Sequence, residues 1–86
     1  MALSDLPEWI GDETTIIRTI EFASFPDAIA AVDRVAAVAE ELNHHPDIDI
    51  RWRTVTFRCS THSAGKVTER DYELARRIDG IVTDSI

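Results

Sequence analysis

The chain has 86 residues, 44% of them hydrophobic and 29% charged, with only three glycines and three prolines, so disorder and low complexity are excluded. Because about 40 residues is the practical minimum for independent folding, we expect one globular domain, residues 1–86. The formal net charge of -7 repels polyphosphate and anionic lipid, which argues against a nucleic-acid partner and against a membrane surface.

Two strands are predicted near the amino end of the chain. In LPEWIGDET, residues 6–14, an apolar pair precedes Gly11 and Asp12, which predicts a short strand followed by a hairpin turn. The next run, TTIIRTIEF at residues 14–22, is rich in β-branched side chains, and all but one of its apolar residues share one parity. This run predicts a second strand.

A helix is predicted from Ser24 to about Asn43. Ser24 is suited to the N-cap, Pro26 to the first turn, and Asp27 to the positive end of the helix dipole. Pro46 disfavours helical geometry at the residue before it, so the helix ends close to the paired histidines. Apolar residues recur at three-four spacing along this segment, at Ala28, Ile29, Val32, Val35, Ala36, Ala39 and Leu42.

Two further strands are predicted in IDIRWRTVTFRC, residues 48–59. The apolar parity changes near Arg53 and Thr54, and a tight hairpin or bulge there would return both halves to one buried face. We interpret the arginines of this run as a solvated strand face and not as an RNA contact, given the acidic chain. Cys59 lies in the apolar phase, which favours a buried structural thiol over a nucleophile.

A second helix is predicted after Thr68, which heads TERD with Asp71 three residues later. The order strand, strand, helix, strand, strand, helix favours an α+β fold. We expect a single-domain two-layer sandwich, in which a four-stranded antiparallel sheet carries the helices on one face.

The compartment and assembly follow from composition. The first nine residues, MALSDLPEW, lack the basic start and apolar stretch of a signal peptide, and one cysteine cannot form an intramolecular disulfide, so a cytoplasmic location is expected. A small core gains from burying further apolar surface. We therefore expect a homodimer or homotetramer.

Three histidines are predicted to gather at one end of the sheet. His44 and His45 stand at the helix exit, and the hairpin returns the chain so that His62 can approach them, with Glu40 one helical turn before His44. Such a set suits acid-base chemistry near neutral pH. It also suits a metal ion, and from spacing alone the two possibilities are equal; His44 by itself is more simply interpreted as a helix cap.

The spacing of these residues resembles the signature of the pterin-4a-carbinolamine dehydratases. Glu40 is followed after three residues by His44-His45-Pro46, then after five by Trp52, after nine by His62 and after eight by Asp71. The strings LPEW, STH and TERD fit the same family, so the resemblance spans nearly the whole chain.

The resemblance implies an enzyme that removes water from a 4a-hydroxy-tetrahydropterin to give quinonoid dihydropterin, which supports tetrahydropterin recycling after aromatic amino acid hydroxylation. It implies a small-molecule pterin substrate and no metal or organic cofactor. By the same resemblance, His44 and His62 are the acid-base residues and His45 holds the substrate. Glu40 orients or polarises His44, and Trp9 borders the pocket.

Other residues of the signature keep two interpretations. Arg70 and Asp71 are equally suited to substrate contact and to helix capping with a surface ion pair. Ser60 and Thr61 suit hydrogen bonds to the pterin edge or ordinary strand-end bonds. Trp52 continues a buried parity, which favours core packing over stacking on pterin. The alternative function is a non-catalytic module that binds pterin or another protein, because animal members of the family also serve as a dimerization cofactor for a transcription factor.

Overall fold

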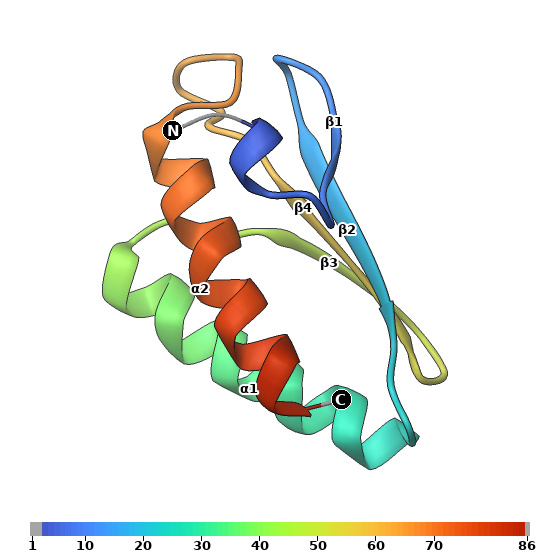
Figure 1. Ribbon diagram of the computed structural model, residues 1–86. Helices are drawn as coiled ribbons and strands as arrows, with labels where there is room; N and C mark the ends of the chain where they lie inside the picture. Colours follow the sequence, from blue (N-terminus) through green and yellow to red (C-terminus); the bar gives the residue numbers. More distant parts are fainter. Residues whose placement is uncertain (1–2, 86) are drawn as a thin grey trace.

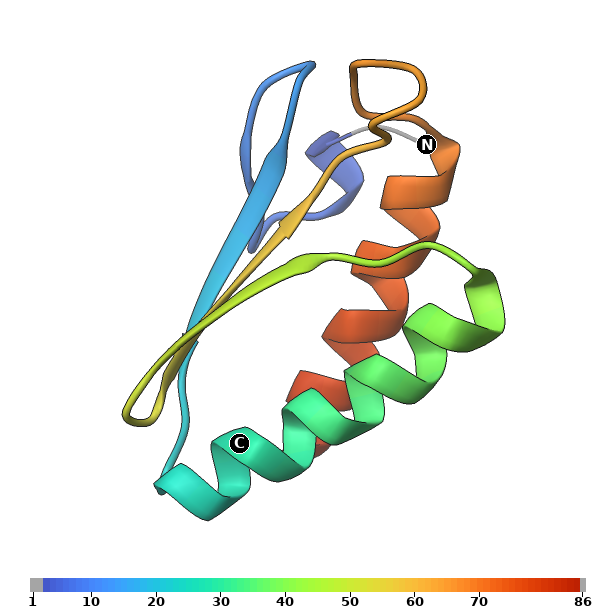
Figure 2. The same ribbon diagram turned by 180° about the vertical axis from the view of Figure 1, so that it is seen from behind.

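A four-stranded antiparallel sheet carries two long helices on one face (Figure 1), and the view from behind shows the other face uncovered by them (Figure 2). The computed structural model describes residues 3–85. The strands lie in the order β1-β2-β4-β3, so β1 and β3 are the edges. The elements are the 3₁₀ helix η1 (Leu3–Asp5), β1 (Ile10–Gly11), β2 (Ile16–Glu21), α1 (Phe25–Leu42), β3 (Asp47–Arg51), β4 (Thr54–Cys59) and α2 (Glu69–Ser85). The predicted fold class and order of elements are confirmed.

The turn between β1 and β2 is built on Gly11 and Asp12. Oδ1 of Asp12 accepts hydrogen bonds from the hydroxyl and backbone N–H of Thr14 at 2.6 and 2.8 Å, and these bonds lower the pKa of the Asp12 carboxyl. Gly11 has φ +145°, and a Cβ there would lie 2.1 Å from the carbonyl oxygen of Thr15. Glycine is therefore required at the end of this short strand.

Helix α1 begins and ends as predicted. The hydroxyl of Ser24 accepts from the N–H of Asp27 at 3.2 Å, which caps the helix. At the other end Asn43 has φ 51° in the left-handed region, and the N–H groups of Asn43 and His44 donate to the carbonyls of Glu40 and Ala39. This pair of bonds is a Schellman motif, so the helix stops at Leu42, Asn43 caps it, and His44 is the first residue after the cap.

The β3–β4 hairpin turns at Trp52 and Arg53, which confirms the predicted change of parity. Ile48 faces Phe57 and Ile50 faces Val55 in the register, so their side chains share one face of the sheet.

The prediction that Trp52 packs in the core is wrong. Trp52 has φ 55° in the turn and is 71% exposed, because the turn extends beyond the helices, and the Arg53 guanidinium lies over its ring. The length of β4 separates Trp52 from the histidine end of the sheet.

The core lies between the sheet and the helices, and it also takes in Leu6 and Trp9 from the amino-terminal segment. Cys59 is fully buried, as predicted. The fully buried large side chains of this core are Ile16, Phe22, Val35, Val55, Phe57, Leu74, Ile78 and Val82. Within residues 3–85, no helix is both long enough and apolar enough to cross a membrane.

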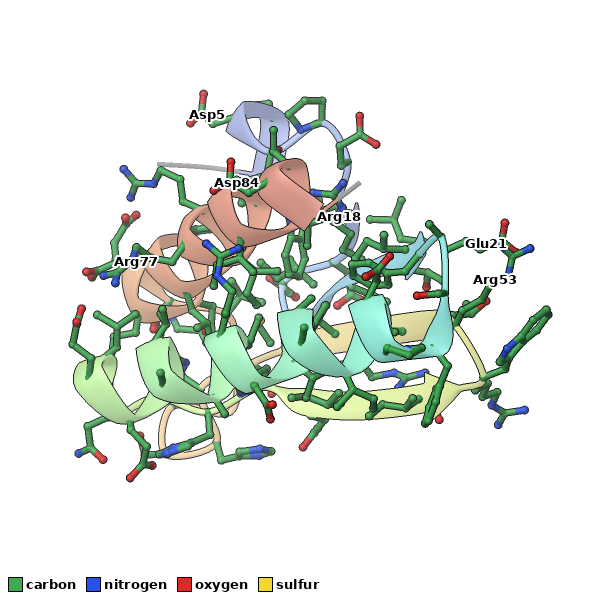
Figure 3. The ribbon with its side chains drawn as sticks, turned by 90° about the horizontal axis from the view of Figure 1, so that it is seen from below. Asp5, Arg18, Glu21, Arg53, Arg77 and Asp84 are labelled. Atoms are coloured by element: carbon green, nitrogen blue, oxygen red, sulfur yellow. The ribbon has the colours of Figure 1, made fainter. Side chains whose placement is uncertain are left out.

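Exposed ion pairs join the elements at the periphery. Figure 3 shows Arg77 and Asp84 on α2, and Arg53 with Glu21 beside the end of the hairpin. Arg77 pairs with Glu41 of α1 at 2.9 Å, and Arg53 pairs with Glu21 at 3.8 Å. Such exposed pairs contribute only about 0–1 kcal/mol each, so the buried core determines the fold.

Candidate active site

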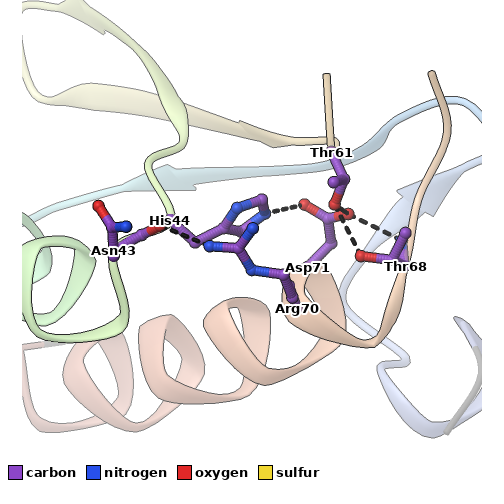
Figure 4. Close-up of polar contacts among 6 residues, drawn as sticks. All are labelled: Asn43, His44, Thr61, Thr68, Arg70 and Asp71. Atoms are coloured by element: carbon purple, nitrogen blue, oxygen red, sulfur yellow. Dashed lines mark hydrogen bonds and ion pairs between the residues drawn. The ribbon is translucent and has the colours of Figure 1, made fainter. Parts of the chain in front are cut away.

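A buried histidine–carboxylate pair lies where the carboxyl end of α1 meets the amino end of α2 (Figure 4). Nε2 of His44 is 2.6 Å from Oδ1 of Asp71; Asp71 is completely buried and His44 is 8% exposed. An ionised carboxylate only accepts hydrogen bonds, so the hydrogen of this bond belongs to Nε2. Nδ1, the other ring nitrogen of His44, forms no hydrogen bond within the described part of the chain.

The second oxygen of Asp71 is held by two threonines. Oδ2 accepts from the hydroxyl of Thr61 at 2.7 Å and from the backbone N–H of Thr68 at 2.8 Å. Because the single hydroxyl hydrogen of Thr61 is used on Asp71, Thr68 must donate its own hydroxyl hydrogen to Thr61, at 2.7 Å. The result is a directed chain of bonds from Thr68 through Thr61 to Asp71, which fixes the carboxylate that His44 contacts.

Arg70 and Asp71, adjacent in the first turn of α2, have different partners. The expected surface ion pair is wrong for both residues. Asp71 does cap its helix, through the N–H of Thr68, but it is buried and pairs with His44. Arg70 donates from Nη2 to the backbone carbonyl of Asn43 at 2.6 Å, so its observed partner is main chain and not a carboxylate.

Glu40 contacts His45 and not His44, so the predicted role of Glu40 in orienting His44 is wrong. Oε2 of Glu40 is hydrogen-bonded to Nε2 of His45, and both side chains are largely exposed. The left-handed backbone at Asn43 takes the following residues out of helical geometry. Adjacent residues of an extended segment point to opposite sides, so His44 turns inward and His45 outward.

His62 lies in an exposed turn directly after Thr61. The turn is closed by hydrogen bonds from the N–H of Thr61 to the carbonyl of Lys66, at 3.0 Å, and from the N–H of Gly65 to the carbonyl of Thr61, at 2.9 Å. Gly65 has φ +68°, a conformation that glycine adopts without strain. His62 is thus one residue from the network that holds His44, while the meeting of all three histidines around one substrate stays a prediction.

Trp9 and Ser60 differ in burial and in location. Trp9 is only 3% exposed, and its Nε1 donates to Oδ1 of Asp79 at 2.8 Å, so the indole is anchored in the core. Ser60 is half-buried at the end of β4. Their contact with a substrate stays a prediction.

Among residues 3–85, no three histidine, cysteine, aspartate or glutamate side chains lie where they could share a metal ion.

Sequence reasoning overlooked two members of the site. The sequence predicts only that Thr68 caps α2 and that Asn43 ends α1, whereas the structure places both within the hydrogen bonds around His44 and Asp71. The capping motif TERD was the available signal for Thr68, since a capping residue lies beside the carboxylate three positions later. No local pattern indicates the contact of Asn43 with Arg70, because it joins two helices.

The fold and this network together define an α+β domain with a buried histidine–carboxylate pair between its two helices. The family model of pterin 4 alpha carbinolamine dehydratase matches residues 1–81. The chain belongs to the pterin-4a-carbinolamine dehydratase family, and it is therefore a hydro-lyase.

Curated relatives agree with this family. A Nocardia farcinica protein is 64% identical over 78 residues, which cover 91% of this chain and 82% of the relative. A Mycobacterium avium protein is 56% identical over 81 residues, covering 94% of this chain and 86% of the relative. Both are provisionally named as pterin-4-alpha-carbinolamine dehydratases.

Solved structures show the same fold. The Brucella melitensis transcriptional coactivator/pterin dehydratase is 32% identical with a TM-score of 0.86, over 92% of this chain and 86% of that chain. A pterin dehydratase-like protein described as a RuBisCO assembly factor of the alpha-carboxysome has a TM-score of 0.70, over 85% of this chain and 84% of that one. At 23% identity, the second likeness concerns the fold alone.

Proposed function

We propose that the chain dehydrates 4a-hydroxy-tetrahydropterin to quinonoid dihydropterin and water by histidine acid-base catalysis, as a step of tetrahydropterin recycling. The observation that carries the proposal is the 2.6 Å bond between Nε2 of His44 and the buried carboxylate of Asp71. This bond leaves Nδ1 of His44 for the substrate. The family supplies the reaction, and the geometry supports a proton-transfer role for this imidazole.

The reaction needs two proton movements. The hydroxyl oxygen on carbon 4a takes up a proton and leaves as water with the electrons of the C–O bond. The lone pair of the neighbouring ring nitrogen forms a C=N bond, and the hydrogen on that nitrogen passes to a base. One imidazole delivers a proton and another removes one, so no proton is consumed. We assign these two exchanges to His44 and His62.

Asp71 orients the His44 ring by accepting the hydrogen bond from its Nε2. The carboxylate accepts from His44, Thr61 and Thr68, so it is held in place before the reaction begins and needs no reorganisation during it. Because the Thr61 hydroxyl is used in this way, we propose that Thr61 supports Asp71 and does not contact the pterin edge. His45, Trp9 and Ser60 remain the proposed substrate contacts, with Glu40 acting on His45.

A dehydration assay tests the proposed function. Chemically generated 4a-hydroxy-tetrahydropterin is added to the purified protein with a chelator present, and the absorbance of the quinonoid product is followed. We expect the wild type to exceed the spontaneous rate, and His44→Ala and His62→Ala to lose most of that excess. A wild type no faster than the spontaneous reaction, or full activity in both variants, would contradict the proposal.

The same assay separates the alternatives. Activity that disappears with the chelator and returns with zinc would favour the metal-binding interpretation of the histidines. Binding of a pterin without turnover, measured by calorimetry, would favour the non-catalytic module. Each outcome differs from the expected chelator-resistant turnover.

We also propose that the chain assembles as a homodimer or homotetramer. Ile48 and Ile50 on the edge strand β3 are 36% and 38% exposed, and a second copy could cover this apolar surface. Light scattering after gel filtration should give two or four times the mass of one chain. A mass of one chain at micromolar concentration would contradict the proposal.

A further inference from the structure

The carboxyl end of α1 receives its positive charge from another helix. All residues of α1 are described, and its last turn contains no basic side chain of its own. Arg70 of α2 reaches across and donates from Nη2 to the carbonyl of Asn43 at 2.6 Å, as the dashed line in Figure 4 shows. A cation at this place meets the free carbonyls and the negative end of the helix dipole.

The peptide bond between Asn43 and His44 is held at both of its polar atoms. Its carbonyl oxygen accepts from Arg70, and its N–H, which belongs to His44, donates to the carbonyl of Ala39 at 3.0 Å. A peptide unit is planar, so two bonds at its opposite edges fix the orientation of the plane. The direction of the N–Cα bond of His44 is fixed with it, and the contact of the ring with Asp71 then limits rotation about that bond.

The ring of His44 is held from the same helix that holds this peptide. Asp71, the residue after Arg70, binds Nε2 of His44. Consecutive residues of α2 therefore restrain the main chain before His44 and the side chain of His44 itself. With both restraints present, Nδ1 points in one direction; with the Asn43 carbonyl released, the backbone can rotate while the ring stays bonded to Asp71.

We propose that Arg70 is a positioning residue for His44, acting through the main chain of Asn43 and not through contact with the substrate. The inference rests on the proposed function, in which His44 exchanges a proton with the pterin. It replaces the expectation that Arg70 binds substrate. A displacement of about 1 Å at a reacting group lowers a rate by as much as about 100-fold, so a modest rotation of this peptide has a measurable effect.

The matched variants are Arg70→Gln, Arg70→Lys and, as a control, Arg77→Gln. Arg77 is also an exposed arginine of α2 that bonds across to α1, through Glu41 at 2.9 Å, but it lies about two turns further along α2 than Arg70 and its partner is a side chain, not the main chain before His44. We expect kcat to fall about 10-fold in Arg70→Gln with KM changed less than about twofold. Arg70→Lys, which keeps one donor and the charge, should recover part of the loss, and Arg77→Gln should match the wild type.

A second comparison uses the His44→Ala background. If Arg70 acts through His44, then Arg70→Gln lowers turnover no further once the imidazole is gone. A further loss of equal size in that background would overturn the inference, as would a rise in KM with kcat unchanged, which indicates substrate contact. An equal fall in Arg77→Gln would show that general docking of the helices is responsible.

Nuclear magnetic resonance of the His44 ring tests the same inference without substrate. The Nε2–H and ring carbon signals of His44 should shift or broaden in Arg70→Gln and stay unchanged in Arg77→Gln. Unchanged His44 signals in Arg70→Gln would overturn the inference even if the wild type is active. Conversely, an inactive wild type would contradict only the proposed function, because the ring signals still report whether Arg70 positions His44.

Discussion

His44 and Asp71 are 27 residues apart in the chain, yet Nε2 of His44 lies 2.6 Å from Oδ1 of Asp71 inside the protein. The first prediction concerns Asp71→Asn. An amide has one acceptor oxygen where the carboxylate has two, so it cannot satisfy the donors from His44, Thr61 and Thr68, and it also removes the negative charge facing the imidazole. We expect turnover to fall about 100-fold or more, because general acid-base catalysis typically contributes a factor of about 100 to 10,000 to a rate.

A stability control distinguishes this effect from partial unfolding. Leaving a buried donor unpaired costs about 1–3 kcal/mol, so Asp71→Asn should also lower the free energy of unfolding. Ile78→Val, a fully buried change on the same helix, costs about 0.5–1.5 kcal/mol without touching the network. If Ile78→Val reduced turnover as much as Asp71→Asn, the catalytic role of the carboxylate would be wrong.

The second prediction is that Thr61→Val weakens both stability and turnover. Valine has nearly the shape of threonine but no hydroxyl, so Asp71 loses one donor and the hydroxyl of Thr68 loses its acceptor. We expect a loss of about 1–3 kcal/mol in the free energy of unfolding by urea, and a smaller fall in kcat than for Asp71→Asn.

The sheet offers a matched control for the lost hydroxyl. Thr19 and Thr56 form a similar hydroxyl pair at 3.0 Å, but in an exposed place where water can replace either partner. Thr19→Val should change the free energy of unfolding by less than about 0.5 kcal/mol and leave kcat unchanged. Equal effects of Thr61→Val and Thr19→Val would contradict a role of Thr61 in holding Asp71.

The third prediction is that Glu40→Gln affects catalysis less than Asp71→Asn does. Glu40 is bonded to the exposed His45, and water can partly replace either side chain. If His45 and Glu40 act together in holding substrate, both Glu40→Gln and His45→Ala should raise KM more than they lower kcat. Steady-state kinetics of the two variants and their double variant measure this. A fall in kcat for Glu40→Gln as large as for Asp71→Asn would show instead that Glu40 acts on His44.

Local chemistry explains why much of the fold was predictable. The cap at Ser24, the helix end at Asn43 and the change of parity near Arg53 are each decided by a few neighbouring residues, and all three are found in the structure. Trp52 was misplaced because parity predicts a face of the sheet only while the strand continues. Trp52 itself has a left-handed backbone conformation in the turn, and its side chain therefore points away from the helices.

The sequence indicates His44, Thr61 and Asp71 as candidates, but not how their side chains pair. Glu40 and His44 have the four-residue spacing of a helical pair, but the left-handed Asn43 lies between them, and the partner of Glu40 becomes the next residue, His45. Asp71 has the position of an ordinary helix cap, and only the packing of α2 against Thr61 and His44 buries it. Such pairings depend on contacts between distant segments, which spacing along the chain does not contain.

The fourth prediction concerns the pH dependence of stability through Cys59. Burial, followed by the negative charges of Asp71 and Asp47, raises the pKa of the Cys59 thiol from 9.0 to about 12. Below pH 9.0 the thiol of Cys59 is protonated in both the folded and the unfolded state. Between the two values the unfolded chain releases a proton that the folded chain keeps, so the free energy of unfolding falls as pH rises, by at most about 1.4 kcal/mol per pH unit. Urea unfolding of the wild type and Cys59→Ala, compared at about pH 8 and about pH 10 with the same thiol-free buffers, should show the steeper fall in the wild type. Equal falls in the two proteins would mean that the thiol ionises as easily when folded as when unfolded, and that Cys59 is not buried beside the charge of Asp71.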